Sequence, residues 1–173
     1  YGNLVMDFLT RVRAGDFPVF SGESVYAFNG NILTVRSAPG HPYMVGLLDV
    51  LTARQLSPLA VQHLALWLCY VGGVGLLQVS LVRLRPSFGW SACAFAAIYA
   101  MSPALITPLV LHDMYMTFTA MPLLVFVWHS VARVMEQGRL RHYGWVGLGC
   151  AGMWYAHPPL GFLGTIGAWF LVS

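Results

Sequence analysis

The chain has 173 residues, of which 58% are hydrophobic and only 9% are charged, whereas an ordinary soluble domain carries about 25% charged residues. This composition excludes an ordinary soluble domain. The net charge of +3 comes from arginines that are dispersed among apolar segments, a distribution that does not suit a nucleic-acid partner.

Residues 1–56 differ from the rest of the chain. They hold four of the six acids and four of the nine arginines, with turn signals at "AGDFP", "FNGN" and "SAPGHP". We expect two short amphipathic helices within them, Leu4–Val12 and Tyr43–Gln55. Pro42 suits the first turn of the second helix, and Val45, Leu48 and Leu51 form an apolar stripe on it. Helices of this kind commonly lie along a membrane surface.

Long uncharged runs follow. Pro58–Val82 and Pro86–His112 contain no charged residue, and each exceeds the roughly 20 apolar residues that cross a bilayer as a helix. We therefore predict an all-α, polytopic transmembrane bundle over residues 57–173, with spans at about 58–82, 88–111, 115–132, 143–156 and 160–173. The fourth span is short, so one long kinked helix over 143–173 is an alternative. The chain lacks an initiator Met and a signal peptide, and we expect it to be part of a longer protein or its ordered part.

The arginines indicate an orientation. Among the loops that join spans, they occur only after the first span (Arg83, Arg85) and the third (Arg133, Arg139, Arg141). The positive-inside rule makes these loops cytoplasmic. Residues 1–56, His112–Asp113 and His157 then lie on the outer face of the membrane. The arginines within residues 1–56 count against this orientation, but a long structured segment translocates largely regardless of charge.

The tightest polar element on the outer face is "HDMY", which contains His112 and Asp113. A carboxylate and an imidazole at the end of a span can hold a divalent cation, and Mg²⁺ or Mn²⁺ suits the carboxylate. The alternative is that a short turn at the interface simply favours polar residues.

Three further residues are candidates. Asp7 and Asp16 can each serve as a catalytic base. The alternative for Asp7 is an exposed pair with Arg11 at i, i+4, and for Asp16 it is ordinary turn chemistry. His157 lies in "YAHPPLG", where it either lines a site, because proline breaks at membrane depth occur in protein-lined cavities, or merely marks a helix stop.

Haem ligation is a further possibility for His63 and His129, since imidazole is a usual axial ligand. The chain has no Cys-x-x-Cys-His sequence, and the two histidines fall near opposite ends of their spans. We therefore expect no haem.

A family resemblance follows from the order of these motifs. The segments that carry the resemblance are an acidic first loop with "RAGDFPVFSG", a polar "NG…APGHPY" stretch, "AIYAMSPALITPLVLHD" and "YAHPPLGFL". The chain resembles the N-terminal third of the bacterial GT-C-type multi-pass membrane proteins. These are glycosyltransferases that use lipid-linked sugars, together with their uncharacterised relatives. The resemblance implies a bacterial inner-membrane location, with residues 1–56 in the periplasm.

The resemblance also implies residue roles. Asp7 matches a first-loop aspartate that acts as catalytic base or metal ligand. Asp113, with His112, matches a second acidic motif that holds metal or donor phosphate, although the motif here has one acid instead of a pair. His157 matches a histidine near the donor phosphate. Independently, a loop arginine such as Arg36 suits a phosphate, because its fork of donors matches phosphate oxygens.

The sequence thus predicts a GT-C-type glycosyltransferase, or its N-terminal part. It would transfer a sugar from a polyprenyl-phosphate donor on the periplasmic side. The alternative is a non-catalytic membrane subunit that works with other membrane subunits in a larger complex. A transporter is disfavoured because no acid or arginine lies at mid-bilayer depth.

Overall fold

The computed structural model describes residues 2–19, 21–22, 31–32, 39–103, 106–107 and 115–172. Within these residues the regular elements are helices, apart from β1 (Ser21–Gly22) and β2 (Asn31–Ile32), which pair antiparallel. The all-α class predicted from the sequence is confirmed.

The N-terminal segment contains two helices, as expected. α1 runs over Gly2–Ala14 and α3 over Gly40–Leu51. Pro42 lies in the first turn of α3. Proline lacks a backbone N–H, and at this position an N–H would have no acceptor within the helix. The apolar stripe on α3 is shorter than predicted: Val45 is buried, whereas Leu51 is 70% exposed, because α3 ends at Leu51 and not at Gln55.

α4 (Pro58–Leu84) begins at a complete N-terminal cap. Ser57 Oγ accepts a hydrogen bond from the Ala60 N–H at 3.2 Å, and Pro58 occupies the first helical position. The chain then turns through the 3₁₀ helix η1 (Pro86–Phe88) into α5 (Gly89–Ala100). α5 covers only the first half of the span expected at 88–111, and residues 108–111 lie outside the described part of the chain.

The remaining helices are α7 (Tyr115–Gln137), α8 (Leu140–Ala156) and α9 (Pro158–Val172). α9 folds back on α8, and the indole N–H of Trp154 donates to Thr165 Oγ1 at 3.1 Å. The alternative of one long kinked helix over 143–173 is therefore wrong. The close return requires glycine, because a Cβ on Gly161 would lie 2.7 Å from the Trp154 Cα.

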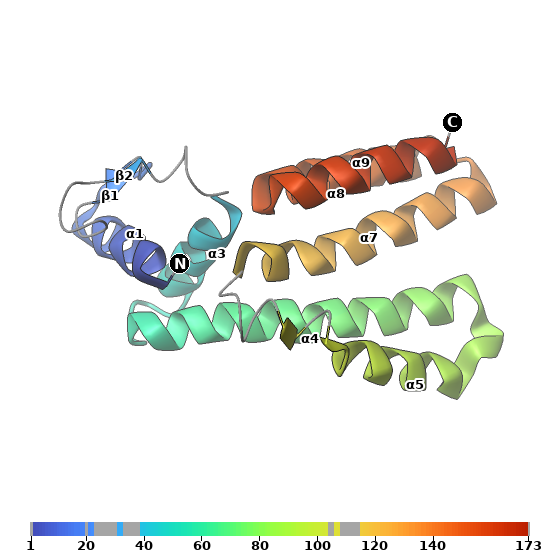
Figure 1. The fold of residues 1–173 in the computed structure, drawn as a ribbon, viewed down its shortest axis with the longest axis horizontal. Helices are drawn as coiled ribbons and strands as arrows, with labels where there is room; N and C mark the ends of the chain where they lie inside the picture. Colours follow the sequence, from blue (N-terminus) through green and yellow to red (C-terminus); the bar gives the residue numbers. More distant parts are fainter. Residues whose placement is uncertain are drawn as a thin grey trace.

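These helices form an elongated bundle. Figure 1 shows α4, α7, α8 and α9 side by side along the long axis, with α5 against α4. α1 and α3 lie together at one end, and α3 contacts α4, α7 and α8 there. We call this end the α1–α3 end. The opposite end, which we call the arginine end, carries Arg83, Arg85, Arg133, Arg139 and Arg141 around the turns that follow α4 and α7.

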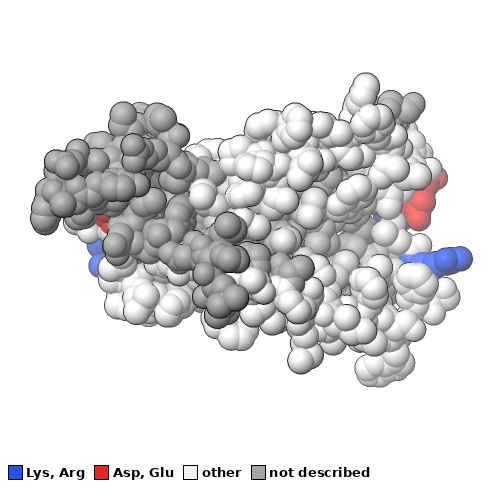
Figure 2. Space-filling view, in the orientation of Figure 1, with Lys and Arg blue, Asp and Glu red and all other residues white. Residues whose placement is uncertain are grey.

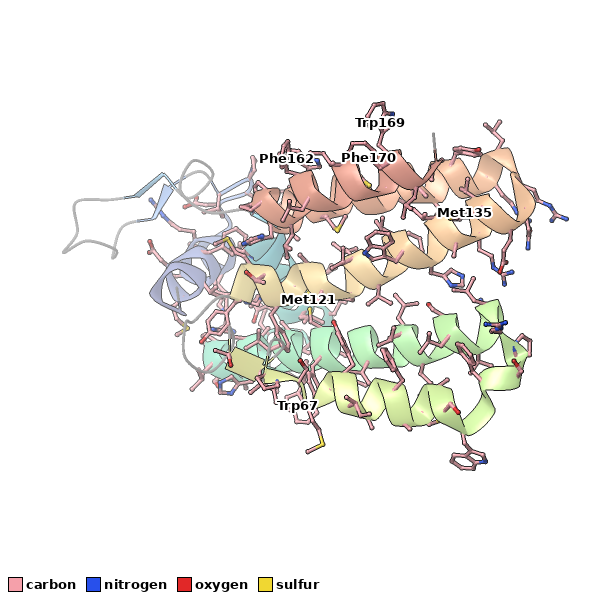
Figure 3. The ribbon with its side chains drawn as sticks, turned by 45° about the vertical axis from the view of Figure 1, so that its right-hand side comes forward. Trp67, Met121, Met135, Phe162, Trp169 and Phe170 are labelled. Atoms are coloured by element: carbon pink, nitrogen blue, oxygen red, sulfur yellow. The ribbon has the colours of Figure 1, made fainter. Side chains whose placement is uncertain are left out.

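Two of the described helices, α4 and α7, are long and apolar enough to cross a membrane. In the most apolar 18-residue stretch of each helix, only 28% of α4 and 39% of α7 is buried inside the structure. The core helix of a soluble protein would be mostly buried. Aromatic side chains project from the sides of the bundle (Figure 3), and Trp67, Trp169 and Phe170 are 63%, 65% and 71% exposed.

Charge is distributed accordingly. On the face shown in Figure 2, the blue and red atoms of the described residues lie at the two ends of the molecule, and the described residues drawn between them are uncharged. The described residues thus give this face a charged region at each end, and many apolar side chains of the helices between the ends are exposed.

Candidate functional site

Buried ionisable groups gather at the α1–α3 end. Among the described residues, the fully buried aspartates and histidines are Asp7, His41 and Asp49, which are 4%, 0% and 0% exposed. All three belong to α1 or α3. Buried groups of this kind require partners and are concentrated at functional sites, so this end is the candidate site.

His41 lies in the first turn of α3 and faces α7. Its Nδ1 is 2.8 Å from Thr119 Oγ1, and the Thr119 hydroxyl donates its single proton to the Tyr115 carbonyl at 2.9 Å. The hydroxyl oxygen must therefore accept from His41, which places the proton on Nδ1. In the neutral ring, Nε2 is then the basic nitrogen.

The position of His41 is fixed from two further sides. The ring of Tyr115 lies 5.6 Å from the imidazole, centroid to centroid. Gly40, the preceding residue, touches the end of α8 so closely that a Cβ there would lie 2.7 Å from the Ala156 Cα. The start of α3 is thus held between α7 and α8.

Asp7 lies on the buried face of α1. The adjacent Phe8 packs against Tyr43 of α3 with ring centroids 5.0 Å apart and against Gly46. Because Asp7 is 4% exposed, its interpretation as part of an exposed surface pair is wrong.

Asp16 lies in a different environment. It follows α1 and accepts from Arg11 Nη1 at 2.9 Å, with both side chains partly exposed. The structure therefore gives the two predicted bases different surroundings: Asp7 is enclosed by the packing of α1, whereas Asp16 faces solvent.

Asp49 was not identified from the sequence. Its carboxylate receives two hydrogen bonds from Arg13, from Nη2 at 2.6 Å and from Nε at 3.2 Å, and the bond to Asp49 raises the pKa of Arg13. Arg13 Nη2 also donates to the Leu56 carbonyl at 3.0 Å. This network ties α1 to α3 and to the segment that leads into α4.

The sequence did contain a signal for the buried groups of α3. His41, Val45 and Asp49 are spaced by four residues, so they share one face of a helix. Val45 marks that face as the buried one, and the polar residues on either side of it require partners there.

His157 forms the hinge between α8 and α9. Its backbone N–H donates to the Met153 carbonyl at 2.7 Å, and its Nδ1 accepts from the Leu160 N–H at 3.2 Å. The side chain thus caps α9, and Pro158 follows at the first helical position. Burial lowers the pKa of His157, which favours the neutral ring that this acceptor role requires.

A cavity of about 610 Å³ opens beside this end of the bundle. It lies against α4 and α7, and Tyr115, whose ring also faces His41, forms part of its wall; the lining residues are His63, Leu66, Trp67, Tyr70, Ile106 and Tyr115. An apolar cavity with a few polar groups beside buried ionisable residues is the usual form of a ligand site.

Three predicted site residues, Arg36, His112 and Asp113, lie outside the described residues. Within the described ranges, no three His, Cys, Asp or Glu side chains come together as a metal site would require. The predicted divalent cation, bound by His112 and Asp113, stays a prediction. His63 and His129 line separate cavities, one near each end of the bundle.

No family model, curated protein or solved structure matches the chain.

Proposed function

We propose that the chain is a polytopic membrane protein with its α1–α3 end on the periplasmic side of a bacterial inner membrane. The exposed apolar side chains between the two charged ends support a lipid environment. The arginines at the opposite end support this orientation through the positive-inside rule.

We further propose that the α1–α3 end belongs to a GT-C-type glycosyltransferase with a polyprenyl-phosphate sugar donor. The observation that carries this proposal is the presence of two buried aspartates and one buried histidine at this end, beside a cavity open to the membrane-facing surface. A lipid-linked donor requires such a place, because its tail stays in lipid while its phosphate lies at the membrane surface.

In this reaction the acceptor hydroxyl attacks the anomeric carbon, the bond from that carbon to the phosphate oxygen breaks, and a base takes the hydroxyl proton. Asp7 is the favoured base, since Asp16 lies in an exposed ion pair. Arg36 and His157, and a cation held by His112 and Asp113, remain the proposed partners of the departing phosphate.

The test uses the full-length protein in vesicles that contain polyprenyl-phosphate-linked sugars, with a membrane extract as acceptor. Release of polyprenyl phosphate is measured. We expect Asp7→Asn to lower the rate by a factor of about 10² to 10⁴, as for loss of a general base. Thr10→Ala, on the exposed side of α1, should retain the rate.

Full activity in both Asp7→Asn and Asp113→Asn would contradict the assignment of these residues. If the wild-type protein shows no transfer, co-purifies with other membrane proteins and tolerates Asp113→Asn in cells, the non-catalytic subunit is the better account.

A further inference from the structure

A second cavity, of about 920 Å³, lies at the arginine end between α4, α7 and α8. It is distinct from the candidate site, which lies at the other end of the bundle. Each of the three helices contributes polar side chains to its lining: Ser80 and Arg83 from α4, His129 and Arg133 from α7, and Arg141 and His142 from α8.

The charge of this cavity is only partly compensated. Arg133 Nη1 pairs with Glu136 at 3.2 Å on the exposed side of α7. Within the described part of the chain, Arg83 and Arg141 make no ion pair. Three guanidinium groups therefore share one acid, and the cavity has an excess of positive charge.

Two buried polar atoms in the lining also lack hydrogen-bond partners among the described residues. They are Ser80 Oγ and His129 Nδ1, and Ser80 is only 5% exposed. Ser130, by comparison, satisfies its hydroxyl by donating to the Phe126 carbonyl at 2.9 Å. Buried polar atoms are nearly always satisfied, so Ser80 and His129 add to the arginines two polar groups that a ligand in this cavity can satisfy.

Apart from Ser130 and Gln137, the rest of the lining is apolar. Val79, Trp145 and Leu148 are 46%, 49% and 60% exposed, so the cavity opens onto the side of the bundle. A ligand that fits must combine an anionic group, placed among the arginines, with an apolar portion along the open wall.

We propose that this cavity binds an anionic phospholipid, with its phosphate between Arg83 and Arg141 and an acyl chain against Trp145 and Leu148. Basic pockets between membrane helices on the cytoplasmic side bind such head groups, and guanidinium matches phosphate geometry. The proposal rests on the membrane location given above and is independent of glycosyl transfer.

The test uses the purified, delipidated full-length protein in a neutral detergent. Dioleoylphosphatidylglycerol is added, and binding is measured by native mass spectrometry. Dioleoylphosphatidylcholine and inorganic phosphate are the comparison probes. We expect phosphatidylglycerol to bind at least about tenfold more tightly than either, because only it supplies both net negative charge and acyl chains.

Variants identify the site. Arg83→Gln combined with Arg141→Gln should weaken phosphatidylglycerol binding by about 25-fold, about fivefold for each charge near the membrane surface. Arg85→Gln is the matched control. Arg85 carries the same charge at the same end, but it lies over the Phe88 ring, 5.7 Å from its centroid, and does not line the cavity.

A gain of binding provides a test that misfolding cannot imitate. Glu136→Gln removes the one acid that pairs with the cavity arginines, and we expect it to strengthen phosphatidylglycerol binding by about fivefold. Unchanged or weaker binding in a folded Glu136→Gln protein would overturn the proposal. So would equal losses in the Arg85→Gln control and the double variant, or equally tight binding of phosphatidylcholine. Binding of inorganic phosphate as tight as that of the lipid would overturn the choice of a lipid ligand.

Discussion

His41 and Thr119 show how one hydrogen bond holds the start of α3 against α7. The Thr119 hydroxyl accepts from a ring that is completely buried. Thr119→Val keeps the shape of the side chain but leaves the Nδ1–H of His41 without this acceptor. We expect the free energy of unfolding to fall by about 1–3 kcal/mol, the cost of a buried unsatisfied donor.

Thr10→Val is the matched control for this substitution. The Thr10 hydroxyl donates to the Met6 carbonyl at 2.9 Å on an exposed face, where water replaces the bond. Its effect should stay within about 0.5 kcal/mol. Unfolding in detergent, followed by circular dichroism, measures both variants, and equal effects would contradict the role of Thr119.

Asp16 and Asp49, which both pair with arginines, differ in burial. Asp49 is fully buried and Asp16 is half exposed. Asp49→Asn should lower stability by about 1–3 kcal/mol, less than a fully buried pair, because Arg13 is 30% exposed. Asp16→Asn should cost at most about 1 kcal/mol. The same unfolding measurement compares them, and a larger loss for Asp16→Asn would contradict this ranking.

At the scale of the helices, His157 links stability to pH. Burial lowers the pKa of His157 below its ordinary value of about 6.5. In acid the unfolded chain therefore binds more protons at this residue than the folded protein, so stability falls as the pH drops below about 6.5. Above that pH the group is neutral in both states and contributes no pH dependence.

The comparison variant is His157→Asn, since asparagine caps helices without titrating. The thermal midpoint of the wild-type protein should fall more between pH 7.5 and pH 5 than that of His157→Asn. His142 also has a lowered pKa, through desolvation and the adjacent Arg141, but it is present in both proteins. Identical pH profiles would show that His157 does not contribute.

The return of α9 along α8 depends on Gly161. A Cβ there would lie 2.7 Å from the Trp154 backbone, so Gly161→Ala must push the helices apart. We expect a loss of about 1–3 kcal/mol, as for overpacking. Gly147→Ala in α8 meets no atom within 4 Å and should be neutral or slightly stabilising. Thermal unfolding of the two variants tests this close contact. Equal midpoint temperatures for Gly161→Ala and Gly147→Ala would contradict it.

The sequence predicted the helices better than their packing. Uncharged runs and the two prolines at 158–159 indicate where helices begin and end, because breaks act locally. That α9 reverses against α8 depends on one glycine meeting Trp154, and no local pattern encodes that contact. The ion pair between Arg13 and the buried Asp49 was missed for the same reason: it joins residues 36 positions apart.

For the whole molecule, the charged ends predict accessibility from opposite sides of a membrane. Thr10→Cys and Gln137→Cys, each in a protein whose native cysteines are replaced, place one thiol at each end. In intact spheroplasts, an impermeant maleimide should label Thr10→Cys only, and Gln137→Cys should label after lysis. The reverse pattern would invert the orientation, and labelling of both before lysis would contradict membrane insertion.

The contact between Gly40 and Ala156 has a consequence for how the protein is made. These residues are 116 positions apart (156 − 40), which corresponds to roughly 6–23 s of synthesis at 5–20 residues per second. During that interval α3 has been synthesised, but its docking surface on α7 and α8 is still incomplete. The burial of His41 is thus a late event in biogenesis, completed only after the hydrophobic helices that follow it have been made.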